Sequence, residues 1–359
     1  MRARFKSVAV LHNKISADAS KDELDVLVEV NHVADVLNTM GYEVFIVPFS
    51  LDFNEVSQIL LSIRPDFVFN LVESVENDGQ LIHLAPSILD HLKIPYSGCP
   101  KDAIYLTSNK LLAKKYLRAS GIPTPDWMTC EEAMLQQNRK CTPFILKSVW
   151  EHASIGLDED SVMEMKNPET LREVLKKRRR LTGKEFFAEE YVDGREFNVS
   201  ILAGDVMPIP EIKFVDYPRD KIKVVGYRAK WEEDSFEYTH TVRSFDYDQA
   251  DQAVHQSLSE ICRKVWRVFG MKGYGRVDFR VGADGVPQVV DINTNPCISP
   301  DGGFCAATAQ AGLSIGDVME RIIADSVHSA SRSPSYRNPA EYQYHVIYNY
   351  QSYRQAVNM

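Results

Sequence analysis

The sequence lacks the features that mark secreted, membrane and thiolate-metal proteins. Its six cysteines lie far apart, no two form a CxxC pair, and no histidine follows at zinc-site spacing. We therefore expect free thiols in a reducing compartment rather than a zinc site. No apolar run approaches the ~20 residues that span a bilayer, and the N-terminal run of about four is too short for a signal peptide. These absences predict a cytoplasmic protein with no membrane partner.

Excess positive charge and a dinucleotide fingerprint are also missing. The 359-residue chain has a formal net charge of -9, which argues against broad attraction to nucleic acid. No GxGxxG follows the first apolar run at residues 7–11, so a Rossmann-type dinucleotide site is not indicated. Hydrophobic residues make up 44% of the chain and charged residues 25%, which is ordinary for a folded protein of two or three modules.

Strand and helix patterns alternate over the first hundred residues. The apolar runs predict strands at 7–11, 43–47 and 66–70, and the helical spacing predicts helices at 23–40, 55–63 and 80–92. This alternation favours a parallel sheet with both faces covered. The first predicted domain is an α/β unit over residues 1–98.

The remaining patterns indicate an α+β organisation. They predict helices at 109–120, 167–180 and 251–269, and strands at 143–147, 185–191, 197–202, 275–281 and 287–293. We place a central domain at 99–192 and a third domain at 193–327. The Tyr-rich segment 328–359 lies outside the pattern, and we predict a tail packed on the surface with no assigned role.

The sharpest chemical pattern is a predicted hairpin with acidic residues on both strands. Residues two apart in a strand face the same side, so Arg276 lies beside Asp278, and Asp291 lies beside Asn293. The Asp-Gly at 284–285 is typical of a hairpin loop. If the two polar faces coincide, two carboxylates and an amide oxygen converge, and their repulsion calls for a cation. Hard oxygen ligands suit Mg²⁺, and the alternative is a solvent-exposed hairpin without metal.

Two basic residues fit the same chemistry. Arg276 next to a metal site would hold a transferring phosphoryl group. Lys147 ends an apolar strand, which is unusual for a charge that only meets solvent. Both residues therefore favour a phosphate-handling site over a structural hairpin.

Several motifs in order resemble ATP-grasp ligases, specifically the D-alanine–D-alanine ligase branch. They are FNLVE…NDG at 69–79, SNKLLAKKYLRASGIPTP at 108–125, PFILKSVWEHASIG at 143–156, FFAEEYVDGREFNVSIL at 186–202, and GYGRVDF…VVDINTNP at 273–296. The likeness extends from about residue 7 to about residue 323 and covers nearly everything except the tail. It implies an ATP-grasp fold preceded by a parallel-sheet, pre-ATP-grasp domain, with ATP between the second and third modules.

The resemblance also implies a reaction. A carboxylate attacks the γ-phosphate of ATP to give an acyl phosphate and ADP, and an amine then attacks the acyl carbon. A carboxylate is a poor electrophile, so phosphorylation supplies the leaving group, and the protein positions the reactants and neutralises charge. The partners are therefore a small-molecule carboxylate and a small-molecule amine, and a homodimer is expected because dimers are frequent in the family.

The resemblance assigns the phosphate contacts to three lysines. Lys110 and Lys147 would contact the phosphates of ATP, and Lys230 would close over them from a mobile loop. The segment 151–156 would be the phosphate-covering loop, although it is poorer in glycine and serine than the usual one.

The nucleoside contacts fall on a single short segment. By the family pattern, Glu189 binds the adenine amino group, backbone at Glu190 to Val192 completes the adenine edge, and Glu196 binds the ribose hydroxyls. Without the resemblance, solvated acidic residues around a turn would be the ordinary interpretation.

The metal ligands implied by the resemblance are Asp278, Asp291 and Asn293, with Arg276 and Lys230 as the catalytic cations. The expected cofactors are ATP and one or two Mg²⁺ ions, with Mn²⁺ as an alternative. Asp291 replaces the usual glutamate, so its reach is one methylene shorter.

The predicted substrate pocket departs from the family. Cys297 replaces a glycine whose N–H helps to form an oxyanion site, and Asp301 and Gly302 lie near the position of an acceptor-recognising serine. Glu73 replaces a histidine, and an acid there favours a cationic or hydrogen-donating group. For Cys297 we predict a structural thiol rather than a nucleophile, because no histidine partner is evident.

The family's N-terminal glutamate, which binds the first amino group, has no clear counterpart. Asp25 and Glu29 are alternatives for it, and neither is favoured. These departures predict a ligase for amino acid or peptide-like substrates in specialised biosynthesis. The alternative is a true D-alanine–D-alanine ligase of cell-wall synthesis. A second alternative is a non-catalytic ATP-binding regulator, which the retained Arg276 and the metal ligands disfavour.

Overall fold

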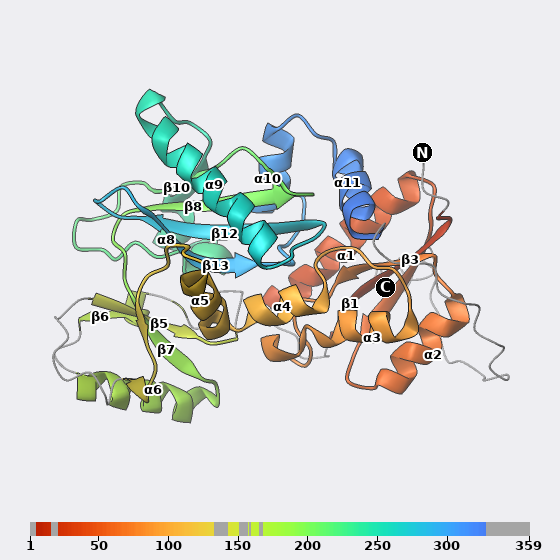
Figure 1. The fold of residues 1–359 in the computed structure, drawn as a ribbon, viewed down its shortest axis with the longest axis horizontal. Coiled ribbons are helices and arrows are strands. Elements are labelled where there is room, and N and C mark those ends of the chain that lie inside the picture. The colour runs from red at the N-terminus through yellow and green to blue at the C-terminus, as the bar shows by residue number, and fades with distance from the viewer. Residues whose placement is uncertain are drawn as a thin grey trace.

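The structure is a computed structural model that describes residues 5–15, 21–132, 143–150, 157, 159–164 and 168–327. The predicted phosphate loop 151–156 and the tail 328–359 lie outside the described residues. The strands form three sheets, with helices packed around them. The N-terminal sheet lies at the right of Figure 1, and the small central sheet lies at the lower left. In the described part of the chain, no helix combines the length and apolar character needed to cross a bilayer.

The N-terminal unit is a parallel sheet between helices, as predicted. Its strands, in spatial order, are β2 (Glu43–Phe49), β1 (Ser7–Asn13) and β3 (Phe67–Leu71). Its helices are α1 (Lys21–Thr39), α2 (Phe53–Ile63) and α3 (Leu84–Leu92). Val8 and Val10 pack with α1 on one face, whereas Ala9 and Leu11 pack with α2 and α3 on the other. Strands buried on both faces read as continuous apolar runs.

The predicted helix over 80–92 is wrong in one respect, because the structure divides it. A 3₁₀ turn, η1 (Gly79–Leu81), is capped by Asp78, whose side chain accepts a hydrogen bond from the N–H of Gln80 at 2.8 Å. The α-helix begins only at Leu84, which places Pro86 in its first turn. Proline lacks an N–H, and within the first turn that loss breaks no helical hydrogen bond.

Two helices lead from the N-terminal unit into the rest of the molecule. Helix α4 (Lys101–Ser108) was not predicted, and α5 (Lys110–Ala119) follows at the predicted place. Asn109 separates them: its backbone is extended, and its side chain accepts a hydrogen bond from the N–H of Leu112 at 2.9 Å. This N-cap fixes the position of Lys110 as the first residue of α5.

The central sheet is small and antiparallel. Its strands, in spatial order, are β4 (Trp127–Met128), β7 (Phe186–Glu190), β5 (Pro143–Ser148) and β6 (Val162–Glu164). A 3₁₀ turn, η3 (Glu159–Ser161), precedes β6. Helix α6 (Pro168–Thr182) covers one face through Leu171 and Leu175. The opposite face is left for the site described below.

The largest sheet has six strands. Five follow the order β11 (Thr241–Ser244), β10 (Glu211–Phe214), β8 (Arg195–Leu202), β12 (Tyr274–Val281) and β13 (Pro287–Asn293), and β9 (Asp205–Val206) pairs with β8. The helices around it are α7 (Tyr227–Trp231), α8 (Phe236–His240), α9 (Gln252–Val268), α10 (Gly303–Gln310) and α11 (Ile315–Val327), with the 3₁₀ turn η4 (Gln249–Asp251) before α9.

The hydrophobic cores cross the predicted domain boundaries. Ile104 and Leu117, from α4 and α5, pack in one core with Leu258 of α9 and Phe279 of β12. The N-terminal core likewise includes Tyr274 of β12. The boundaries at 98/99 and 192/193 remain predictions, and the shared cores hold the segments on either side of them together.

Leu258 is fully buried in the core beneath the largest sheet. Replacing it by alanine removes apolar contacts and leaves a cavity, so we expect Leu258→Ala to lower the free energy of unfolding by about 2–5 kcal/mol. Urea unfolding measures this loss. The control is Gln256→Ala on the exposed face of the same helix, for which a change within about 0.5 kcal/mol is expected. Equal losses in the two variants would contradict the packing of α9.

Candidate active site

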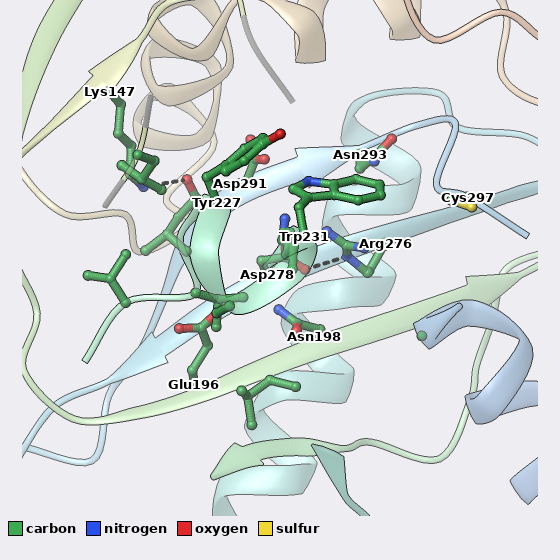
Figure 2. Close-up of a pocket in the computed structure, with 18 of the residues that line it drawn as sticks. Lys147, Glu196, Asn198, Tyr227, Trp231, Arg276, Asp278, Asp291, Asn293 and Cys297 are labelled. Atoms are coloured by element: carbon green, nitrogen blue, oxygen red, sulfur yellow. Dashed lines mark hydrogen bonds and ion pairs between the residues drawn. The ribbon is translucent and has the colours of Figure 1, made fainter. Parts of the chain in front are cut away.

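The β12–β13 hairpin brings the predicted acidic residues together. Asp278 lies directly opposite Asp291, and Arg276 lies opposite Asn293. The register shifts just after Asp278, which is the signature of a β-bulge. The predicted coincidence of the two polar faces is therefore confirmed, and Figure 2 shows these four side chains gathered at one place.

Cations neutralise both carboxylates of the hairpin. The guanidinium of Arg276 donates to both oxygens of Asp278, at 2.7 and 2.9 Å. The ammonium of Lys110 donates to Asp291 at 2.6 Å. Two facing carboxylates would otherwise repel each other. Lys110 reaches this point because α5 begins with it, and its backbone N–H donates to the carbonyl of Val149 at 2.9 Å.

The donor set at this point fits a hard divalent cation. Among the described residues, no three histidine, cysteine or acidic side chains are placed to share a metal. The hairpin instead offers two carboxylates and the amide oxygen of Asn293, with room for further ligands from the cavity. Mg²⁺ usually binds through one or two carboxylates and completes its shell with phosphate oxygens and water. The ammonium group on Asp291 shows that this carboxylate attracts a cation.

A cavity of about 1270 Å³ opens above the hairpin. It exceeds the usual range for one small ligand, about 300–1,000 Å³. Every predicted site residue lines it: Glu73, Lys110, Lys147, Glu189, Glu190, Val192, Glu196, Lys230, Arg276, Asp278, Asp291, Asn293, Asp301 and Gly302. The structure thus brings these residues together around one cavity, although some of them are more than two hundred positions apart in the sequence.

Glu196 and Val192 meet the same arginine. Arg280 donates to the carboxylate of Glu196 at 2.9 Å and to the carbonyl of Val192 at 3.0 Å. Arg280 is itself only 6% exposed. Arg280 lies two residues after Asp278 and therefore shares its strand face, but no role was predicted for it. Arg280 fixes Glu196 and Val192, which are both predicted to contact the nucleoside, relative to the hairpin.

Glu189 is held by two lysines at the base of the cavity. Its carboxylate pairs with Lys147 at 2.5 Å and with Lys114 at 2.6 Å, and the residue is 1% exposed. Burial alone would raise the pKa of Glu189, but the two ammonium groups outweigh it and lower that pKa. Burial also lowers the pKa of Lys114. Lys114 was missed because one helix lysine looks like any other in sequence.

Helix α7 supplies the side of the cavity nearest the hairpin. Lys230 lies there, and burial followed by the charge of Arg276 lowers its pKa. Trp231 also lines the cavity, and its indole nitrogen is buried without a hydrogen-bond partner in the described structure. Figure 2 shows Trp231 beside Arg276 and Asn293. Trp231 was not predicted, because an aromatic residue after a lysine carries no distinctive pattern.

Acidic groups collect at the other end of the cavity. Burial raises the pKa of Glu73 to about 7, and the charge of Asp25 adds to the shift. Burial and then Glu73 raise the pKa of Glu29. Burial and then Asp301 raise the pKa of Asp25. The carboxylate of Glu29 accepts the N–H of Ile298 at 2.7 Å. Each of these acids therefore holds its proton more tightly than usual, and a cationic group in a ligand would favour their ionised forms.

Cys297 lines the cavity as a protonated thiol. Its sulfur contacts the hydroxyl of Ser299 at 3.1 Å. Burial, followed by the charges of Glu29 and Glu73, raises its pKa well above the usual range. A thiol held in this form is a poor nucleophile. The environment agrees with the predicted structural role.

Comparison with known proteins identifies the family. Residues 116–324, more than half of the chain, match the family described as "D-ala D-ala ligase C-terminus". The chain belongs to the D-alanine–D-alanine ligase family. The ligase from Aquifex aeolicus (strain VF5) is 29% identical over 295 residues, which cover 81% of this chain and 92% of that protein.

Solved structures share the fold of this ligase. The ATP complex of the D-alanine–D-alanine ligase from Bacillus anthracis has a TM-score of 0.67 at 19% identity, over 91% of this chain and 98% of that one. The VanG D-Ala:D-Ser ligase from Enterococcus faecalis has a TM-score of 0.65 at 17% identity, over 89% and 99%. These matches confirm the predicted ATP-grasp fold. The chain is an ATP-binding enzyme that forms C–N bonds.

Glu73 should make the ligase less stable as the pH rises. Its pKa is about 7 in the folded chain against 4.5 ordinarily, so the folded state holds this proton more tightly. The corresponding stabilisation is complete below the unfolded-state pKa and is lost as pH rises through about 7. Relative to Glu73→Gln, we expect the wild type to lose on the order of 2 kcal/mol between about pH 5 and 8.

Urea unfolding of both proteins across this pH range measures the effect. Glu76→Gln is the control, because Glu76 is an exposed acid three residues away and should leave the pH profile of the wild type unchanged. Parallel profiles for the wild type and Glu73→Gln would show that Glu73 titrates normally.

Proposed function

We propose that this ligase joins the carboxylate of one amino acid to the amine of another through an acyl phosphate formed from ATP. One observation carries the proposal: Asp278 and Asp291 face each other in register, with Arg276 and Lys110 on them, inside the large cavity. This arrangement places two cationic side chains beside two potential ligands of a metal ion, the groups that phosphoryl transfer needs.

The phosphate end of the cavity would be organised by the hairpin and three lysines. Asp278, Asp291 and Asn293 would hold Mg²⁺, or Mn²⁺ in its place, as one or two ions. Bound there with the nucleotide, the ion would neutralise charge on the phosphates. Lys110 and Lys147 would bind the phosphate oxygens, and Lys230 on α7 would cover them. The low dielectric around Lys230 strengthens such a contact.

The nucleoside would lie against the central sheet. Glu189 and Glu196 would accept hydrogen bonds from the base and the ribose, and backbone at Glu190 and Val192 would meet the adenine edge. The contact of Arg280 with both Glu196 and Val192 supports this placement, because it holds the two groups in one fixed arrangement.

The chemistry then needs positioning more than covalent help from the protein. A carboxylate oxygen of the first substrate forms a bond to the γ-phosphorus, and the bond from that phosphorus to the bridging oxygen breaks, releasing ADP. The amine nitrogen of the second substrate attacks the acyl carbon, and phosphate leaves with the electron pair of the broken C–O bond. The attacking nitrogen loses a proton in this step, and the departing phosphate takes that proton up. Arg276 would hold the phosphoryl oxygens throughout.

D-alanine is the first candidate for both substrates. The relatives and solved structures that support it are named as D-alanine–D-alanine ligases. This favours the cell-wall alternative over specialised biosynthesis. A homodimer remains a prediction. The regulator alternative is set aside, because the family assignment makes the chain an enzyme.

A second candidate is a different amino acid pair in specialised biosynthesis. The observation that favours it is the acidic end of the cavity, where burial raises the pKa of Asp25, Glu29 and Glu73 and neighbouring acids add to each shift. Such a pocket suits a substrate that carries a second positive charge. Asp301 and Gly302, which also line the cavity, would contact the acceptor in either case.

The two candidates give different outcomes in a substrate screen. We expect ATP and Mg²⁺ to yield ADP only when an amino acid pair is present, with the ligated product seen by mass spectrometry. Robust turnover with D-alanine alone supports the first candidate. Turnover that requires an amino acid with a cationic side chain supports the second. Failure of every amino acid pair, with nucleotide still bound, would refute the proposed ligation of amino acids.

The hairpin site is tested by Asp291→Ala. Loss of this carboxylate removes one ligand of the bound cation, so turnover should fall by about 10²–10³-fold or more. ADP release measures the rate, and circular dichroism verifies folding. Asp284→Ala is the matched control, since Asp284 is exposed in the turn of the same hairpin, and its rate should stay within about twofold of wild type. Full activity in Asp291→Ala would reject the metal assignment.

A further inference from the structure

Lys114 is a buried lysine behind the wall of the cavity. It is 3% exposed, and its ammonium group lies 2.6 Å from the carboxylate of Glu189 and 2.6 Å from the hydroxyl of Thr124. Lysine is almost never buried to this degree without a specific partner. Lys114 sits one turn after Lys110 on α5, yet it is not among the residues that line the cavity.

Lys147 approaches the same carboxylate from the cavity side. Its ammonium group lies 2.5 Å from Glu189, and it donates to the carbonyl of Val290 at 3.3 Å. Glu189 thus has two counter-ions, one of which lines the nucleotide cavity. Further along α5, Arg118 stacks on the ring of Trp127 at 3.9 Å and pairs with Asp126. Lys114 and Lys147 are the charged groups that act on Glu189.

We propose that Lys114 is a positioning residue that keeps Glu189 ionised when Lys147 turns from it to the nucleotide phosphates. The inference rests on the proposed phosphate role of Lys147. Two cations on one buried carboxylate leave a surplus positive charge, so Lys147 is released to a phosphate without leaving an unpaired buried anion. The permanent partner of Glu189 is then Lys114, which the hydroxyl of Thr124 holds in place.

Removal of Lys114 changes how nucleotide binding depends on pH. In Lys114→Met, Lys147 is the sole partner of Glu189 and can leave only if that buried acid takes up a proton. The bound state then holds a proton that the free state lacks, so affinity falls as the pH rises. In the wild type Lys114 keeps Glu189 charged in both states, and this dependence is absent.

The experiment is calorimetric titration of the full chain with the Mg²⁺ complex of a non-hydrolysable ATP analogue at about pH 6.5, 7.5 and 8.5. Two buffers of different ionisation enthalpy give the number of protons taken up. We expect Lys114→Met to bind the analogue about tenfold or more weakly at pH 7.5, and to take up more protons on binding than the wild type. This readout needs no turnover, so it is independent of whether amino acids are the substrates.

Three further variants make the test specific. Lys115→Met removes the adjacent, exposed lysine of the same helix and should bind like the wild type. Lys114→Arg keeps the charge and should restore proton-independent binding. In Lys114→Met combined with Glu189→Gln, which keeps an amide oxygen facing the cavity, the extra proton uptake should disappear.

Weaker binding in Lys114→Met with the same proton count and pH profile as the wild type would overturn the proposal and leave Lys114 a purely structural role. Unchanged affinity would overturn it as well. If Lys114→Met does not fold, Lys114→Gln keeps a donor for Glu189 and Thr124 without the charge, and the same titration decides between the two outcomes.

Discussion

The site depends on the facing carboxylates of two neighbouring strands. Asp278 and Asp291 are opposite each other because the β12–β13 register places them there, and neither can be buried as an anion without a cation nearby. Arg276 meets one and Lys110 meets the other. The remaining site elements are arranged around this charge balance, since α5 must begin at Lys110 for the second pair to form.

The same cavity has two electrostatic ends. Around the hairpin and α7, cations such as Lys230 and Arg276 suit phosphate groups. Near α1 and the end of β3, burial raises the pKa of acids such as Glu29 and Glu73, so a cationic group would favour their ionised forms. A ligase that activates a carboxylate and positions an amine needs both, because the reaction brings an anion and an amine to one phosphoryl group. The acidic end includes Glu73, which departs from the family pattern, so we expect substrate identity to depend on this end.

Local patterns predicted much of the fold. The apolar runs of β1 and β3, the amphipathic face of α9 and the Asp-Gly turn of the hairpin were all found in sequence, because period and turn chemistry are local properties. The break before α3 was missed, since it depends on where Pro86 falls within a helical turn. Helix α4 was missed because its eight residues are too few for a clear apolar period.

The sequence by itself determined the alternation of Arg276, Asp278, Asp291 and Asn293 and the order of the family motifs, because strand geometry and motif spacing are fixed by the chain. Only the tertiary structure decided which cation neutralises which acid. Lys114 meets Glu189 by the packing of α5 against the central sheet. Charge pairing depends on distances of a few ångströms between distant segments, and one-dimensional spacing does not contain them.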